Sequence, residues 1–125
     1  MKMISRNSIS KQIRQQVYEK YCGRCAYCGE EIQYKDMQVD HLVSLYQGGA
    51  DGVENMMPAC RSCNHYKRAS GLEEWRKQLE ATTKVLSRDC YTYRNAVRFG
   101  QVTETPHKVT FYFEKEMSEC VKKKQ

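Results

Sequence analysis

Two Cys-x-x-Cys pairs constrain the fold of this chain more than any other feature of its sequence. The pairs are Cys25/Cys28 and Cys60/Cys63, with residues 29–59 between them. Zinc prefers four tetrahedral ligands, and thiolates two residues apart on a tight turn reach one metal without strain. The spacing therefore predicts a structural zinc site with four cysteine ligands, which closes a loop around everything that lies between the pairs.

A second choice of ligands stays open at this point. Cys22 also has the Cys-x-x-Cys spacing with Cys25, so the first pair could be Cys22/Cys25. We favour Cys25 and Cys28 because Gly29 supplies the turn that lets backbone amides approach the sulfurs. The remaining cysteines are then expected to be unliganded thiols: Cys22, Cys90 and Cys120.

Length and composition limit the class of protein. The chain has 125 residues, of which 40% are hydrophobic, so we expect a single globular domain without a membrane span. Residues 1–6 lack the apolar stretch of a signal peptide, and the expected location is cytoplasmic, where paired cysteines more often bind metal than form disulfides. The net charge of +6 is compatible with a polyanion such as nucleic acid as a partner, and equally with solvated cationic faces.

The apolar pattern predicts a helix and a strand in the first half of the chain. Ile9, Ile13 and Val17 form one stripe on a helix over residues 8–21, which Ser10 or Ser8 could cap. Residues 37–43 alternate like a half-buried strand. A short extended segment, which Pro58 keeps out of a helix, then leads back to the second cysteine pair.

The second half of the chain predicts helices followed by a strand. We expect one helix from about Cys60 to Ser70, a second with Trp75 on its apolar face, and a third over 85–99 that Gly100 ends. The aromatic segment 109–114 predicts a β-strand. The expected class is therefore α+β, with residues 1–70 forming the zinc-stapled part and residues 71–125 packing on it as one compact domain.

Asp40 and His41 are the residues between the cysteine pairs that most clearly indicate catalysis. A histidine that titrates near neutral pH is a suitable general base for activating water. A carboxylate is the hard oxygen ligand that Mg²⁺ or Mn²⁺ prefers. The dipeptide therefore indicates a hydrolytic centre in which adjacent residues supply a base and a metal ligand.

The order and spacing of these motifs resemble the HNH nucleases, the ββα-metal or His-Me finger family. The resemblance spans Tyr21 to about Lys67 and rests on these residues: Cys25-Ala26-Tyr27-Cys28-Gly29, Val39-Asp40-His41, Gly48-Gly49 before Asn55, and Cys60-Arg61-Ser62-Cys63-Asn64 with Lys67. It implies a ββα-metal finger flanked by an N-terminal helix and by the C-terminal helices and strand. It also implies hydrolysis of DNA phosphodiester bonds with one divalent ion. Among members of the family, a small chain of this kind resembles phage or prophage proteins most.

The resemblance also implies a role for each signature residue. His41 is the general base, while Asp40 and Asn64 hold the catalytic ion, Mg²⁺, Mn²⁺ or a similar cation. Asn55 pins its loop and orients His41 without touching substrate. His65 lies one position after the signature site, and a shift in register would make it the ligand in place of Asn64.

Basic residues after the second cysteine pair are candidates for binding backbone phosphates: Arg61, Lys67 and Arg68. For each of them a solvated helix face explains the charge equally well. A competing interpretation of the whole chain is a non-catalytic zinc module that binds nucleic acid. It is disfavoured because such a module needs no adjacent acid and histidine together with Asn64. The expected partner is DNA, and a homodimer or a phage or prophage protein partner stays open.

Overall fold

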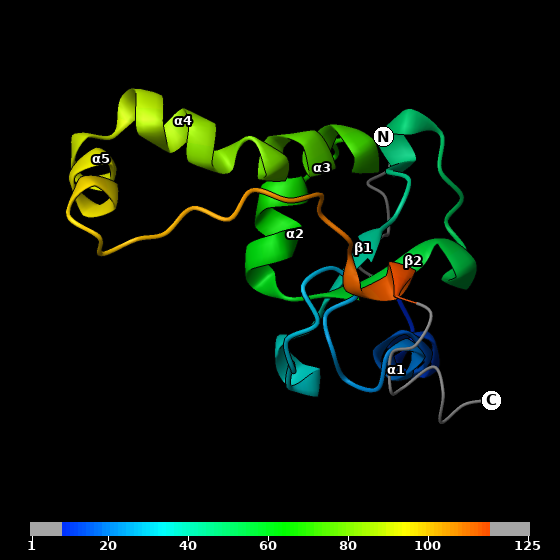
Figure 1. Ribbon diagram of the computed structural model, residues 1–125. Helices are drawn as coiled ribbons and strands as arrows, with labels where there is room; N and C mark the ends of the chain where they lie inside the picture. The colour runs from blue at the N-terminus through cyan, green and yellow to red at the C-terminus, as the bar shows by residue number, and fades with distance from the viewer. Residues whose placement is uncertain (1–8, 116–125) are drawn as a thin grey trace. The chain divides into compact units, whose positions relative to one another are not determined.

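The computed structural model describes residues 9–115 and has the α+β architecture that the sequence predicts (Figure 1). A small sheet pairs two strands, and helices precede and follow it. The strands and helices, in chain order, are α1 (Lys11–Lys20), β1 (Gln38–His41), β2 (Met56–Ala59), α2 (Arg61–Lys67), α3 (Leu72–Glu80), α4 (Thr82–Asp89) and α5 (Tyr91–Arg98). None of the described helices is long and apolar enough to cross a membrane.

The chain divides into two compact units. One contains the described residues up to Gly71 together with 110–115, and the other is Leu72–Val109. The first unit contains both strands, both cysteine pairs and the Asp40-His41 dipeptide. The packing of the C-terminal helices on this unit, which the sequence suggests, stays a prediction.

Helix α1 begins where the sequence predicts and contributes to the core of the first unit. Ser10 Oγ accepts a hydrogen bond from the backbone N–H of Ile13 at 3.1 Å, which satisfies one of the free donors at the helix start. Val17 is fully buried and clusters with Met37 and Met56. The predicted apolar stripe therefore packs this helix against the beginnings of both strands.

The two strands form an antiparallel pair in which β2 is buried along its whole length. The register places Gln38 opposite Ala59 and His41 opposite Met56. Pro58 has no N–H to donate, but its carbonyl accepts a hydrogen bond from the Ala26 N–H at 2.8 Å. The loop that carries the first cysteine pair, residues 25–28 (the cysteine loop), therefore covers this strand. Because α2 follows β2 directly, the order is strand, strand, helix, and the second cysteine pair lies at the start of that helix.

The aromatic segment 109–114 is not the β-strand that its composition suggests. It is an extended segment that ends in a 3-10 turn, Tyr112–Glu114. The N–H groups of the first two turn residues donate to the carbonyls of Tyr27 and Ala26, at 3.0 and 2.8 Å. Aromatic residues favour strands chiefly because they suit half-buried surfaces. Here packing against the cysteine loop provides that burial without a strand partner.

The second unit contains two short helices where one continuous helix was expected over 85–99. Cys90 has extended backbone angles and separates α4 from α5. Its Sγ accepts from Tyr93 N–H at 3.4 Å and so caps the start of α5. Gly100, with a φ of +77°, follows the helix at the position that the sequence predicts for a cap.

We predict that Phe111→Ala destabilises the protein much more than Phe99→Ala. Phe111 is 2% exposed and packs edge-to-face on Tyr27, whereas Phe99 is 73% exposed. Truncating a buried phenylalanine to alanine lowers the free energy of unfolding by about 3 to 5 kcal/mol. Truncating an exposed one changes it by no more than about 0.5 kcal/mol. Urea unfolding of both variants measures the difference, and equal losses would contradict the packing of this segment on the cysteine loop.

Candidate active site

The four predicted cysteine ligands form one cluster. The sulfur atoms of Cys25, Cys28, Cys60 and Cys63 all lie within 4.8 Å of one another, and those of Cys28 and Cys60 are 3.9 Å apart. Zinc–sulfur bonds of about 2.3 Å in a tetrahedron place the sulfurs about 3.8 Å apart. The donor set and its spacing therefore fit one zinc ion, and the prediction that these four cysteines come together in one cluster is confirmed.

Local backbone geometry explains why the two pairs present their sulfurs inward. The N–H of Tyr27 donates to Cys25 Sγ, and the N–H of Cys63 donates to Cys60 Sγ, both at 3.4 Å. These donors favour the thiolate form that a metal requires. Gly29 has a φ of +82°, and a Cβ there would press against the ring of Tyr112. The position thus requires glycine both for its backbone angle and for the close approach of the turn.

The thiols of the cluster are coupled to one another. A hydrogen bond from the Cys63 thiol lowers the pKa of Cys25 to about 5, and the same bond raises the pKa of Cys63. Burial raises the pKa of Cys28 to about 12. Without a cation the sulfurs cannot all ionise side by side, so metal binding must displace protons from this cluster.

Cys22 does not belong to the cluster. It is disulfide-bonded, which removes the Cys22/Cys25 alternative and corrects the expectation of a free thiol. Cys90 is a free thiol as predicted. Cys120, the third cysteine predicted to be a free thiol, lies outside the residues that the structure describes.

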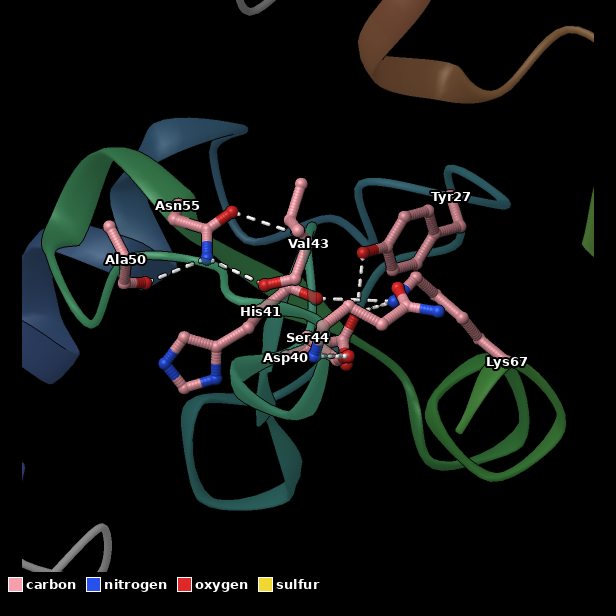
Figure 2. A network of polar contacts seen from close by, with 9 residues as sticks. Tyr27, Asp40, His41, Val43, Ser44, Ala50, Asn55 and Lys67 are labelled. Atoms are coloured by element: carbon pink, nitrogen blue, oxygen red, sulfur yellow. Dashed lines mark hydrogen bonds and ion pairs between the residues drawn. The ribbon is translucent and has the colours of Figure 1, made fainter. Parts of the chain in front are cut away.

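Asp40 is buried between the cysteine loop and α2 (Figure 2). Its Oδ2 accepts a hydrogen bond from the Tyr27 hydroxyl at 2.5 Å and pairs with Lys67 Nζ at 3.1 Å. Burial raises the pKa of Tyr27 far above its usual range, and the nearby charge of Asp40 raises it further. The phenol therefore stays protonated and acts as a donor. A carboxylate has two oxygens with about four acceptor sites, so these two donors leave capacity for a divalent ion.

Lys67 is not exposed at the surface, as a side chain that contacts a DNA phosphate must be. Its side chain is fully buried, and its Nζ also donates to the backbone carbonyl of His41 at 3.1 Å. A buried ammonium is costly unless it is paired and hydrogen-bonded, which both contacts achieve. The expectation that Lys67 binds nucleic acid is therefore wrong, and the residue stabilises Asp40 and the end of β1.

Asn55 joins the two ends of the loop between the strands. Its Oδ1 accepts from Val43 N–H, and its Nδ2 donates to the carbonyls of Val43 and Ala50, at 2.7 to 2.9 Å (Figure 2). Gly49 is required here because a Cβ would overlap the carbonyl of Val43. Asn55 therefore acts on the shape of this loop through hydrogen bonds to its backbone.

His41 and Asp40 line the same cavity, of about 460 Å³. Adjacent side chains on a strand point to opposite faces, and Figure 2 shows the His41 ring on the side away from Tyr27 and Lys67. The His41 side chain is 15% exposed, and its Nε2 lies 2.9 Å from Asp51 Oδ1. Both predicted residues thus border one space, with their side chains on opposite faces of β1.

Asn64 lies on the face of α2 that meets β1. Its Nδ2 contacts Gln38 Oε1 at 3.5 Å. Gln38 and Asp40 share one face of β1, and Asn64 and Lys67 share one face of α2, so Asn64 lies beside the strand that carries Asp40. Asn64 itself is not among the residues that line the cavity.

The alternative ligand His65 lies elsewhere on the helix. It is exposed, and its ring packs edge-to-face on Tyr66 with centroids 5.2 Å apart. The contact between Asn64 and β1 therefore favours Asn64 over His65 as a candidate ligand.

Of the two remaining basic candidates, Arg68 lines the cavity and Arg61 is exposed at the first position of α2. Arg68 has a φ of +51°, which is unusual for a residue with a side chain. Its Nε donates to the carbonyl of His65 at 3.1 Å. Strained backbone of this kind is found at functional sites more often than elsewhere.

The sequence alone missed two residues of this site, Tyr27 and Asp51. Tyr27 lies between two cysteines of the cluster, where a side chain has little freedom, but the motif does not indicate that Asp40 is its partner. Asp51 is an acidic residue in a glycine-rich loop, and loops often carry functional groups. Only the fold brings it to His41.

Comparison with known families matches residues 25–70 to the family described as HNH endonuclease. This segment is an HNH endonuclease domain. The matched range contains all four clustered cysteines and the signature residues Asp40, His41, Asn55 and Asn64.

Two curated relatives are named as endonucleases. The CRISPR-associated endonuclease Cas9 of Corynebacterium diphtheriae is 34% identical over 64 residues, covering 50% of this chain and 6% of the relative. The other relative is YoqL of Bacillus subtilis, whose name describes it as an HNH endonuclease derived from the SPbeta prophage. It is 30% identical over 69 residues, which cover 49% of this chain and 30% of the relative. This chain therefore spans less than a third of either relative.

A solved structure that matches is the type II-C Cas9 enzyme from Actinomyces naeslundii. It is 28% identical, with a TM-score of 0.48, and the match covers 54% of this chain and 8% of that one.

We predict that Cys63→Ser abolishes metal retention and unfolds the first unit, whereas Cys90→Ser does neither. Structural zinc contributes roughly 10 to 16 kcal/mol in small domains, far more than such a unit can lose. Elemental analysis of the purified variants and thermal unfolding give both readouts. A Cys63→Ser chain that keeps its metal and its melting temperature would contradict the role of the cluster.

We predict that Lys67→Met destabilises the protein by about 3 to 5 kcal/mol, because it leaves Asp40 buried without its ion-pair partner. Arg61→Met, an exposed cation on the same helix, should cost within about 0.5 kcal/mol. Adding Asp40→Asn to Lys67→Met should recover part of the loss, since the unpaired charge is then gone. Chemical unfolding of wild type, these three variants and Asp40→Asn alone tests the pair, and strictly additive effects of Lys67→Met and Asp40→Asn would contradict the coupling.

Proposed function

We propose that this chain is a divalent-metal-dependent endonuclease that hydrolyses DNA phosphodiester bonds, with His41 as the general base. The observation that carries the proposal is the cavity lined by both Asp40 and His41 within the HNH domain. A hydrolytic site needs a base and a metal ligand within reach of the same substrate atom. Both relatives named above are called endonucleases, which supports the same reaction class.

The proposed reaction assigns one proton transfer to His41. Its imidazole accepts a proton from water as the water oxygen bonds to phosphorus. The bond from phosphorus to the leaving sugar oxygen breaks, and that oxygen takes up a proton. The His41 side chain is only 15% exposed, so the ring has few alternative positions during this step.

Asp40 and Asn64 are proposed to hold the catalytic ion, Mg²⁺, Mn²⁺ or a similar cation. Carboxylate and amide oxygens suit such an ion. When bound, it stabilises negative charge on the phosphate and the leaving oxygen. Lys67 and Tyr27 keep the Asp40 carboxylate in position, so the ligand does not depend on the ion for its orientation.

Arg61 and Arg68 are proposed to bind backbone phosphates of the substrate. Arg68 lines the cavity, and Arg61 lies exposed at the start of α2. Such contacts position DNA without reading its sequence. We therefore propose low sequence specificity for the isolated chain, or reliance on a phage or prophage partner protein. A homodimer would supply two active sites for a double-strand cut.

The cysteine cluster is proposed to bind zinc in a closed structural site, because four thiolates leave zinc no open position. The cytoplasmic location, which was predicted from the sequence of residues 1–6, stays a prediction. The disulfide at Cys22 is a bond that reducing compartments disfavour.

We predict that the purified protein nicks or cuts plasmid DNA with Mg²⁺ or Mn²⁺ and that His41→Ala lowers the rate by about 10²- to 10⁴-fold. His107→Ala removes an exposed histidine of the other unit and should leave the rate unchanged. A gel assay across divalent ions with the three proteins tests this. DNA binding without cleavage under any ion would instead support a non-catalytic zinc module.

A further inference from the structure

Asp51 lies at the exposed tip of the loop between β1 and β2. Both of its neighbours are hydrogen-bonded to Asn55, since the Nδ2 of Asn55 donates to the carbonyl of Ala50 at 2.7 Å and its backbone N–H donates to the carbonyl of Gly52 at 2.9 Å. Asp51 is therefore a single residue between two anchored positions. Its side chain is 60% exposed, yet Oδ1 lies 2.9 Å from His41 Nε2.

The chemistry of this pair determines which imidazole nitrogen carries hydrogen. An ionised carboxylate can only accept hydrogen bonds, so His41 Nε2 must be the donor. In neutral imidazole one nitrogen carries hydrogen and the other accepts, so the lone pair is then on Nδ1. A base needs an accepting nitrogen, and a carboxylate on the opposite nitrogen is the usual way that proteins select the tautomer.

We propose that Asp51 is the positioning residue of the active site, which keeps His41 in the Nε2–H tautomer and presents Nδ1 to the attacking water. This inference rests on the endonuclease function proposed above. It also gives Asn55 a defined role, because the hydrogen bonds of Asn55 place Asp51 and act on His41 through it. Asp51 does not line the cavity, which agrees with a residue that acts through the base and not on the substrate.

Nuclear magnetic resonance of the full-length zinc-loaded protein tests the proposal without any activity measurement. Long-range ¹H–¹⁵N spectra of the histidines, recorded where the imidazole is neutral, distinguish the two tautomers. Wild type and Asp36→Asn, which changes an exposed aspartate elsewhere in the same unit, should both show His41 as the Nε2–H form. Asp51→Ala and Asp51→Asn should show a mixture, because neither presents a carboxylate to Nε2.

Plasmid cleavage provides the second readout. Asp51→Ala and Asp51→Asn should lower kcat by about 10- to 100-fold, the usual effect of losing a partner that orients a functional histidine. KM should stay within about twofold, since Asp51 is not expected to bind DNA. A lower KM with unchanged kcat would indicate that Asp51 only repels phosphate, and it would overturn the proposal.

The two readouts separate this inference from the proposed function. An active wild type whose His41 tautomer is the same in Asp51→Ala would overturn the positioning role and leave the endonuclease intact. An inactive wild type with an Asp51-dependent tautomer would support the positioning of His41 and count against the endonuclease. A wild type with His41 in the Nδ1–H form would overturn the proposal directly.

Discussion

The buried ion pair between Lys67 and Asp40 is the interaction on which the rest of the site depends. It joins α2 to β1, and the Tyr27 hydroxyl adds the cysteine loop to the same carboxylate. The ammonium also donates to the backbone carbonyl of His41, so it contacts both residues of the dipeptide. An unpaired charge in this position costs several kcal/mol, and the three segments therefore form this arrangement together or not at all.

The cysteine cluster and the ion pair between Lys67 and Asp40 act together to position the residues of the site. The first unit has a small core, in which Val17, Met37 and Met56 are the buried members of one cluster. A core of this size cannot position catalytic groups by packing alone. The cluster determines where the loop at Tyr27 and the start of α2 lie. Lys67 on α2 and Tyr27 in the loop then connect both of these segments to Asp40.

Features that depend on residues near one another in the sequence were predicted correctly, and features that depend on distant contacts were not. Three features were predictable because spacing, capping and alternation are local properties: the four clustered cysteines, a serine cap at Ser10 or Ser8, and strand β1. Lys67 was misjudged because the sequence shows a cation on a helix but not which face is buried. The segment 109–114 was misjudged because aromatic composition indicates burial and not strand pairing. Its partner is a loop far away in sequence, which no local pattern encodes.

The alternation of side chains along β1 has a further consequence for the site. Asp40 faces the cysteine loop and α2, while His41 faces the glycine-rich loop between the strands. Asp40 is therefore positioned by the cysteine loop and Lys67, whereas Asn55 shapes the loop whose Asp51 contacts His41. Because these two sets of contacts share only the strand backbone, the His41 ring can change its orientation without disturbing Asp40. A glycine-rich loop is the element best able to vary, since its few packing contacts leave its shape to Asn55. Differences in activity among chains with this arrangement would then arise in that loop, while the cysteine cluster preserves the fold.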